Sequence, residues 1–306
     1  MHQLMNPSRK AAAKEYLVSI LFVLPSLVLL IYFVLIPTVR TVLISFYKWD
    51  GVNPVMQFVG VDNYKNVFSD PRFHQSILNN FIWAGMHLIF ACCFGFVLAY
   101  FISRIGRCKS LFRNVLFVPN IIALSVSGVV WTLIYNPQMG LLNSMLKAVG
   151  LSALKRTWLG DPGITIFAIS FASSWQAYGY YMTLFLAGLQ NIDTDLYEAS
   201  NLDGANKFKQ FLYITIPGLR NVFSFVFSMG IINGLKGFST VWVMTQGGPG
   251  TSSFLLSLYG YVKAFRENNF GQSMVSGITL GVMIIFLTRL FNYFRDRHQD
   301  QGGMSV

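Results

Sequence analysis

Six long apolar stretches, separated by short polar segments, dominate the pattern of this chain of 306 residues. Each stretch can cross a hydrocarbon core, which takes about 20 helical residues. The segments between them are too short to fold as separate domains, which start at about 50 residues. The pattern therefore predicts an all-α integral membrane protein with six transmembrane helices, at residues 17–36, 77–102, 115–135, 164–186, 222–244 and 273–291.

The composition and the charges support a membrane protein with both termini in the cytoplasm. Hydrophobic residues make up 54% of the chain and charged residues 11%, whereas soluble domains carry roughly 25% charged residues. Arg9, Lys10 and Lys14 precede the first stretch, and the cluster from Arg104 to Arg113 contains no acidic residue. Such clusters mark cytoplasmic segments. Because no small-residue cleavage site follows the first stretch, we expect a retained anchor and not a removed signal peptide. Because the charges flank apolar spans and do not line one face, we expect no nucleic-acid partner.

A polar segment interrupts the apolar pattern at residues 198–217. Asp195 is expected to cap a short helix that has Glu198 three residues later, and Asp203-Gly204 predicts a turn. A second helix is predicted over residues 205–213 and ends before Pro217. Two short helices around a glycine bend would form a compact knob, and an amphipathic connecting loop is the simpler alternative.

Two motifs resemble those of a known family. Residues 198–200 (Glu-Ala-Ser), followed by Gly204 and a hydrophobic stretch to Pro217, resemble the EAA loop of inner-membrane permease subunits of binding-protein-dependent ABC importers. Ser200 stands where that family usually has a second alanine. Residues 245–249 (Thr-Gln-Gly-Gly-Pro) form a Gly-Pro turn by composition. They also resemble the Thr-x-Gly-Gly-Pro segment of carbohydrate permeases of the maltose and glycerol-3-phosphate group.

The resemblance implies the type I ABC importer permease fold in a bacterial or archaeal cell (inner) membrane. The permease core would span residues 76–293, with five transmembrane helices and a coupling loop at 191–220. Residues 1–75 would add a cytoplasmic amino-terminal segment, the first transmembrane helix and an outer loop, and residues 294–306 a cytoplasmic tail. The implied partners are a second permease subunit, two ATP-binding subunits and an extracytoplasmic solute-binding protein. Contact with the ATP-binding subunits is expected from Glu198, Ala199, Asp203, Gly204, Ala205, Phe208 and Pro217.

The sequence lacks the motifs of an enzyme. It contains no G-x-x-x-x-G-K-[ST] phosphate loop, and the six apolar stretches contain no Asp or Glu. Hydrolytic triads and metal-ligand spacings are missing too. His87 is expected to hydrogen-bond to a neighbouring helix, and Cys92, Cys93 and Cys108 are expected to pack without a disulfide. We therefore predict no catalytic residue, no metal site and no cofactor bound by this chain, with ATP and Mg used by the partner ATPase subunits.

Polar and aromatic residues within the fourth and fifth stretches are candidates for a solute path. Sugars bind through hydrogen bonds to their hydroxyl groups and through aromatic rings against their CH faces. Lys236 should face a cavity, because an ammonium group in lipid costs at least several kcal/mol, and a structural bond to a carbonyl is the alternative. Packing is the alternative for the aromatic residues. The candidates are Trp175, Gln176, Tyr178, Asn233, Lys236 and Trp242, with Tyr181 and Phe238 beside them.

The sequence thus predicts a permease subunit of an ATP-driven sugar (oligosaccharide) importer, coupled to its ATPases through residues 198–217. The same motifs fit a permease for glycerol-3-phosphate or related phosphodiesters, and a non-ABC membrane scaffold is the alternative from another class. Gly230-x-x-x-Gly234 and Gly277-x-x-x-Gly281 predict close helix packing, and one of the two seams would face the second permease. The sugar and the nature of the second permease stay open, as does which of the two permeases holds the main solute site.

Overall fold

The computed structural model describes residues 9–106 and 108–302, and the side chains of residues 19–106 and 108–295. The topology prediction also rests on Arg9, Lys10, Lys14, Arg107 and Arg297, whose side chains are not among those described. The described part is mostly helical, with one hairpin of two short strands. That composition agrees with the predicted all-α class.

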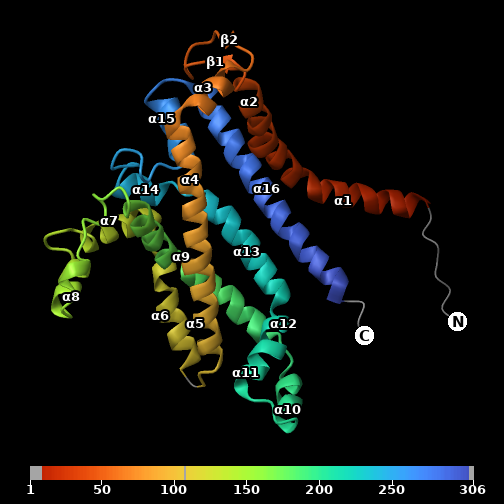
Figure 1. Cartoon of the computed structure of the whole chain (residues 1–306). Coiled ribbons are helices and arrows are strands. Elements are labelled where there is room, and N and C mark those ends of the chain that lie inside the picture. Colours follow the sequence, from red (N-terminus) through yellow and green to blue (C-terminus); the bar gives the residue numbers. More distant parts are fainter. Residues whose placement is uncertain (1–8, 107, 303–306) are drawn as a thin grey trace.

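The amino-terminal helices run toward the end of the molecule that carries the strands, which we call the hairpin end (Figure 1). Residues 19–44 form one long apolar span whose most apolar window is not buried by the rest of the chain. An apolar surface of this length, left uncovered, suits contact with lipid or with another membrane protein. The segment consists of α1 (Arg9–Leu30), the π-helical turn η1 (Ile31–Leu35) and α2 (Ile36–Ile44).

A small cap closes the hairpin end. Its two strands are antiparallel, with Tyr47 opposite Phe58 and Lys48 opposite Gln57. The buried Asn63 fastens the cap, because its side-chain amide donates to the carbonyl oxygens of Ser45 and Tyr47 at 2.9 Å each. The elements of the cap are β1 (Tyr47–Lys48), β2 (Gln57–Phe58) and α3 (Asp62–Ser69).

The next span leads from the hairpin end to the opposite end of the molecule, which we call the α10 end (Figure 1). Asp70 starts it, because its carboxylate accepts from the backbone N–H of Arg72 and Pro71 occupies the first turn. The span is helical over 33 residues and consists of α4 (Pro71–Met86), the π-helical turn η2 (His87–Cys93) and α5 (Phe94–Ser103).

The helix α9 (Thr165–Gln190) is the central helix of the fold. It packs against α4, η2, α5, α6, α7 and α13 and supplies many of the buried residues. Its contact with α5 requires glycine, since a Cβ added at Gly95 would lie 2.9 Å from the carbonyl oxygen of Tyr178. Its polar run of Ser173, Ser174 and Gln176 explains why α9, which matches the predicted stretch 164–186, is less apolar than the other long helices.

The predicted stretch 115–135 is a bent pair of helices and not one continuous helix. α6 (Lys109–Ile121) and α7 (Leu124–Ile134) meet at 93°. Pro119 removes one backbone donor from the last turn of α6, and Ile122 and Ala123 are extended, with ψ of 133° and 139°. The chain then continues through α8 (Leu141–Ala148) and the short η3 (Ser152–Leu154) to α9.

The remaining elements form the α10 end and return to the hairpin end at α15, and α16 then runs away from the hairpin end (Figure 1). The predicted stretch 222–244 is interrupted at residues 236–238, between α13 and α14. In chain order the elements are α10 (Thr194–Leu202), α11 (Lys207–Gln210), η4 (Phe211–Thr215), α12 (Ile216–Gly218), α13 (Arg220–Leu235), α14 (Ser239–Met244), α15 (Leu256–Phe265) and α16 (Phe270–Gly302).

Four helices of the described chain are long and apolar enough to cross a membrane, and the bent pair α6–α7 makes a fifth candidate. They correspond to five of the six predicted stretches. The remaining stretch is α9, which has the length of a span but is shielded by its neighbours, so its polar side chains face protein and a cavity. The four spans are Ser19–Ile44, Pro71–Ser103, Arg220–Met244 and Phe270–Arg295.

Candidate functional site

A cavity of about 420 Å³ lies where two of the membrane helices are broken. It is enclosed by α4 and η2, by the α6–α7 bend, by α9 and by the junction of α13 with α14. Trp83, Leu124 and Phe238 supply apolar surface. The polar lining residues are His87, Asn120, Ser173, Gln176, Tyr180, Tyr181, Asn233, Lys236, Ser239 and Thr240.

Buried amide side chains form hydrogen bonds with the backbone at both helix breaks. At the α13–α14 junction, Asn80 donates to the carbonyl oxygen of Leu235 at 2.9 Å and accepts from the backbone N–H of Leu256 at 2.8 Å. At the α6–α7 bend, Gln176 donates to the carbonyl oxygen of Ile122 at 2.9 Å. Irregular backbone at membrane depth is tolerated where protein satisfies its polar groups or where it lines a cavity. The cavity therefore depends on amides supplied by α4 and α9.

Tyr181 organises one wall of the cavity. Its hydroxyl lies 3.0 Å from Nε2 of His87 and accepts from the Asn233 amide at 3.3 Å. These three side chains come from α9, η2 and α13, so the bonds join three helices beside the cavity. The expectation that His87 bonds to a neighbouring helix is confirmed.

Lys236 brings a positive charge to the cavity. It is the C-cap residue of α13, and its side chain is exposed at the lining. No Asp or Glu is among the described residues that line this cavity. The ammonium group is therefore available to a solute with hydroxyl or anionic oxygens.

The six predicted path residues divide into two groups. Gln176, Asn233 and Lys236 line the cavity. Trp175, Tyr178 and Trp242 do not line it, and each packs on another ring: Trp131 at a centroid distance of 5.5 Å, Phe94 at 5.4 Å and Phe238 at 5.9 Å, respectively. Trp242 is thus one layer behind the cavity-lining Phe238.

Sequence reasoning missed several lining residues that a helical-face count would have found. Ser173, Ala177 and Tyr180 lie at intervals of three and four along α9, on the same face as the predicted Gln176. Asn120 follows Pro119 at the bend, and a polar residue next to a proline in an apolar stretch was the available signal. Ser239 and Thr240 follow the break in the fifth stretch in the same way.

The segment at the α10 end contains two short helices around a bend, as predicted, but with different caps. Asp193, and not Asp195, caps α10, since its carboxylate accepts from the backbone N–H of Asp195. Asn206 caps α11 in the same way through Lys209. Gly204 lies between them with φ of +74°, a backbone conformation that glycine adopts readily.

The second helix of this segment is longer than predicted. It runs from Lys207 through η4 and α12 to Gly218, so Pro217 lies inside the helix and does not end it. The π-helical turn η4 changes the backbone hydrogen-bond spacing just before α12. Pro217 therefore stands at the start of the three-residue α12, a position where proline is tolerated. We call residues 193–218 the α10–α12 segment.

Polar bonds inside the α10–α12 segment join its two short helices to each other. Gln210 is 1% exposed, and its amide donates to Ser200 at 2.9 Å and to Asn201 at 2.7 Å. Tyr197 and Thr215 share a hydroxyl bond of 2.9 Å. Ser200, the residue that departs from the Glu-Ala-Ala pattern, therefore has a bonding role that alanine lacks.

The outer surface of the α10–α12 segment is apolar at several positions. Leu202 is 90% exposed, Phe208 70% and Leu196 54%. Exposed large apolar side chains in a segment outside the membrane spans are typical of an interaction site. The predicted contact residues Glu198, Ala199, Asp203, Phe208 and Pro217 are exposed, Gly204 is exposed at the bend, and Ala205 is half-buried.

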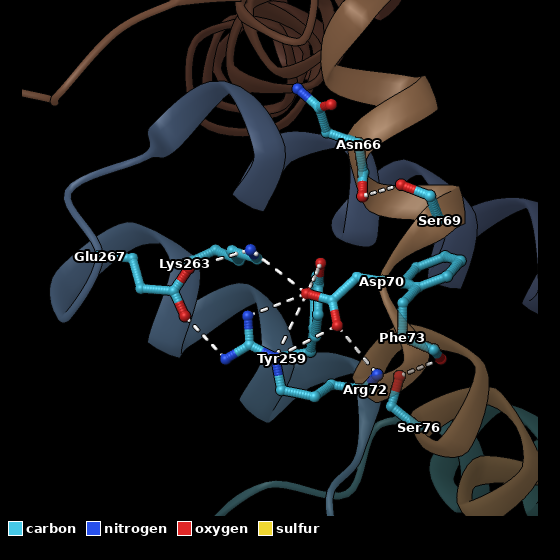
Figure 2. A network of polar contacts seen from close by, with 9 residues as sticks. All are labelled: Asn66, Ser69, Asp70, Arg72, Phe73, Ser76, Tyr259, Lys263 and Glu267. Carbon is cyan, nitrogen blue, oxygen red and sulfur yellow. Dashed lines mark hydrogen bonds and ion pairs between the residues drawn. The ribbon is translucent and has the colours of Figure 1, made fainter.

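A network of charges joins two parts of the hairpin end (Figure 2). Arg72 donates to Asp70 at 2.9 Å and to Glu267 at 2.8 Å. Lys263 lies 3.4 Å from Asp70 and 2.9 Å from Glu267, and the Tyr259 hydroxyl donates to Asp70 at 3.1 Å. The network ties the start of α4 to α15 and the turn after it.

The network keeps its carboxylates ionised. Burial raises the pKa of Asp70, but hydrogen bonds from the Arg72 side chain and backbone outweigh it and lower the pKa to about 2. Burial likewise opposes the lowering of the Glu267 pKa, which the bonds from Arg72 and Lys263 achieve. Asp70 and Glu267 are therefore charged at neutral pH.

Almost the whole chain matches one family of transport proteins. Residues 8–300 match the family described as "Binding-protein-dependent transport system inner membrane component". The chain belongs to this family. Its members are permease components of transport systems, so the chain is a transport subunit of a membrane complex, as the EAA-like motif predicted.

Relatives of this permease over most of its length carry transport descriptions. The probable ABC transporter permease protein YurN of Bacillus subtilis (strain 168) is 36% identical over 87% of this chain and 91% of its own length. The arabinooligosaccharides transport system permease protein AraP of the same organism is 32% identical over 92% of this chain and 87% of its own.

The fold of the permease also matches solved structures. A crystal structure of a bacterial alginate ABC transporter in complex with an alginate pentasaccharide-bound periplasmic protein contains a chain with a TM-score of 0.81. The match covers 94% of this chain and 96% of that chain, at 19% identity. The fold is therefore that of a type I ABC importer permease.

Proposed function

We propose that this chain is the permease subunit of an ATP-driven importer of sugars, and of oligosaccharides in particular. The cavity carries the proposal, since it combines amides and hydroxyls with the rings of Trp83 and Phe238. These groups suit the hydroxyl groups and the CH faces of a sugar. The descriptions of AraP and of the alginate transporter support the same class of solute.

We propose the full set of partners that the family resemblance implies: a second permease subunit, two ATP-binding subunits that use ATP and Mg, and an extracytoplasmic solute-binding protein. The periplasmic protein in the alginate complex supports the last of these. In this arrangement the α10 end and both termini face the cytoplasm, and the hairpin end faces outward. The exposed Leu202 and Phe208 then seat in the ATP-binding subunits.

The mechanism follows from the positions of the two helix breaks. The two helices of the α10–α12 segment are bonded to each other, and the segment follows α9 after a short turn and precedes α13. A push on the segment by the ATP-binding subunits therefore moves α9 and α13, two of the helices that line the cavity. Gln176 of α9 bonds to the break at residues 122–123, and α13 ends at the break at residues 236–238. Movement of these two helices therefore shifts the walls of the cavity.

Lys236 favours a second candidate class, solutes that carry a negative charge. A single ammonium group in a lining without carboxylates attracts phosphate or uronate oxygens. Glycerol-3-phosphate and related phosphodiesters belong to this class, and so do acidic oligosaccharides.

One experiment tests the function and separates the two classes. The complex in liposomes with internal ATP is supplied with binding protein and labelled neutral oligosaccharides, uronate oligosaccharides or glycerol-3-phosphate. Lys236→Met should insert normally, and it should lower uptake of anionic solutes about tenfold or more while neutral sugars lose less. Lys155→Met, on an exposed loop residue, is the matched control. Wild-type complex that takes up none of the three would contradict the proposal.

A further inference from the structure

A second cavity, of about 500 Å³, lies at the α10 end and shares no lining residue with the cavity described above. One wall comes from the end of α5 and the start of α6, and the other from the end of α9 and the α10–α12 segment. We call it the basic pocket, because its walls contain Arg104, Lys109 and Lys207.

The two walls of the basic pocket both carry cations, and no carboxylate is among its described lining residues. Arg104 and Lys109 belong to one wall and Lys207 to the other. No ion pair of the described chain involves any of the three. Positive charges that share a concave site repel one another, so an anion between them is stabilised.

The neighbours of the cations are neutral and hold them in place. The Arg104 guanidinium lies over the Tyr100 ring, 4.3 Å from its centroid. The Lys207 ammonium donates to Oε1 of Gln210 at 3.2 Å, and Gln210 is itself fixed by its bonds to Ser200 and Asn201. Each cation therefore keeps free donors for a ligand in the pocket.

The preference for cations on the cytoplasmic side of membrane helices explains two of the three cations in the basic pocket. Arg104 and Lys109 flank membrane helices, where cytoplasmic cations are common. Lys207 lies in the α10–α12 segment, and its neighbour Lys209 on the same short helix does not line the pocket. Ser103 and Thr194 also line the pocket, and the Ser103 hydroxyl donates to the carbonyl oxygen of Tyr100 at 2.7 Å, so Thr194 is the one of the two whose hydroxyl makes no hydrogen bond within the described chain. Arginine, lysine and hydroxyl donors together are the groups that bind phosphate.

We propose that the basic pocket binds a phosphate group, carried either by the headgroup of an anionic lipid or by a soluble phosphorylated metabolite. Basic pockets between membrane helices on the cytoplasmic side bind anionic headgroups, and the volume also accommodates a small phosphorylated solute. The bound phosphate bridges the α5–α6 connection to the α10–α12 segment. It thereby restrains the segment that would transmit ATPase motion, which is a regulatory role beyond the proposed transport of sugars.

The test uses the assembled complex in nanodiscs and measures its thermal unfolding midpoint at constant ionic strength. In one arm, phosphatidylcholine discs receive glucose 6-phosphate, with glucose as the neutral control. In the other arm, phosphatidylglycerol is added to the discs. The Lys109→Gln, Lys207→Gln double variant removes two pocket cations. The Arg113→Gln, Lys209→Gln double variant removes the same charge from the same two helices at residues outside the pocket.

The wild-type complex should be stabilised in at least one arm, and the pocket double variant should need about tenfold more ligand or more for the same shift. The control double variant should behave as wild type. Stabilisation by glucose 6-phosphate identifies a soluble ligand, and stabilisation by phosphatidylglycerol alone identifies a lipid. No stabilisation in either arm, or equal stabilisation of both double variants, would overturn the proposal.

Discussion

At the scale of single residues, amide side chains decide where the helices break. Asn80 and Gln176 are buried, and each satisfies a carbonyl group that a continuous helix would have used itself. A buried polar group that loses its partner costs about 1–3 kcal/mol. These two residues therefore shape the cavity even though a solute need not touch Asn80.

Gln176→Leu tests this role at the α6–α7 bend. The substitution leaves the carbonyl oxygen of Ile122 without its 2.9 Å partner, so the free energy of unfolding should fall by about 1–3 kcal/mol. Gln190→Leu, at the exposed end of the same helix, should change it by less than about 0.5 kcal/mol. Thermal unfolding of the purified chain gives both values. Equal effects of the two substitutions would show that Gln176 does not support the bend.

The charge network at the hairpin end gives a prediction for Asp70. Asp70→Asn keeps the cap of α4, because asparagine also accepts from the Arg72 N–H, but removes the charge beside Lys263. The side chain of Lys263 is 9% exposed, so stability should fall by roughly 2 kcal/mol. Lys65→Gln, which breaks the exposed pair with Asp62, should cost less than about 1 kcal/mol.

The pH dependence of this network follows from the direction of its pKa shifts. The folded pKa of Asp70 is about 2, below its usual value of 3.8. Its contribution to stability is therefore fully present above pH 3.8 and is lost as the pH falls toward 2. Asp70→Asn should remove that loss from the unfolding curve. An unchanged acid dependence in the variant would exclude Asp70 as its source.

At the scale of elements, the sequence predicted the helices better than their interruptions. Apolar stretches of about 20 residues predict helices directly, and five of the six correspond to apolar spans or a bent span. The breaks at residues 122–123 and 236–238 depend on Gln176 and Asn80, which lie far away in the chain. Local patterns cannot reveal such partners. The same reason explains why Trp175, Tyr178 and Trp242 could not be separated from the lining residues by type alone.

The bend of the α10–α12 segment gives a prediction at this scale. A Cβ added at Gly204 would have nothing within 4 Å, so the strain of a substitution comes from the positive φ and not from crowding. Asparagine tolerates that conformation, whereas a β-branched residue does not. Gly204→Asn should therefore keep near wild-type ATPase stimulation by the loaded binding protein, and Gly204→Val should reduce it several-fold while expression is retained. Equal stimulation in both variants would mean that the bend does not matter for coupling.

At the scale of the whole molecule, the proposed function needs two sites that the same helices connect. In that proposal the cavity with Lys236 receives the solute and the α10–α12 segment contacts the ATP-binding subunits, and α9 and α13 join the two sites. The family and the fold are established by the comparisons. The contact with ATP-binding subunits is the step on which the proposed mechanism depends.

Phe208 tests that contact most directly. Its side chain is 70% exposed on the α10–α12 segment, so Phe208→Asp should not disturb folding but should place a charge in the proposed interface. Phe265→Asp changes a residue that is 64% exposed at the hairpin end and serves as the matched control. The measurement is ATP-dependent solute uptake in liposomes, together with the amount of ATP-binding subunit that copurifies with the chain. The account predicts that Phe208→Asp loses both and that the control keeps the ATP-binding subunits, whereas full retention of both in Phe208→Asp would contradict it.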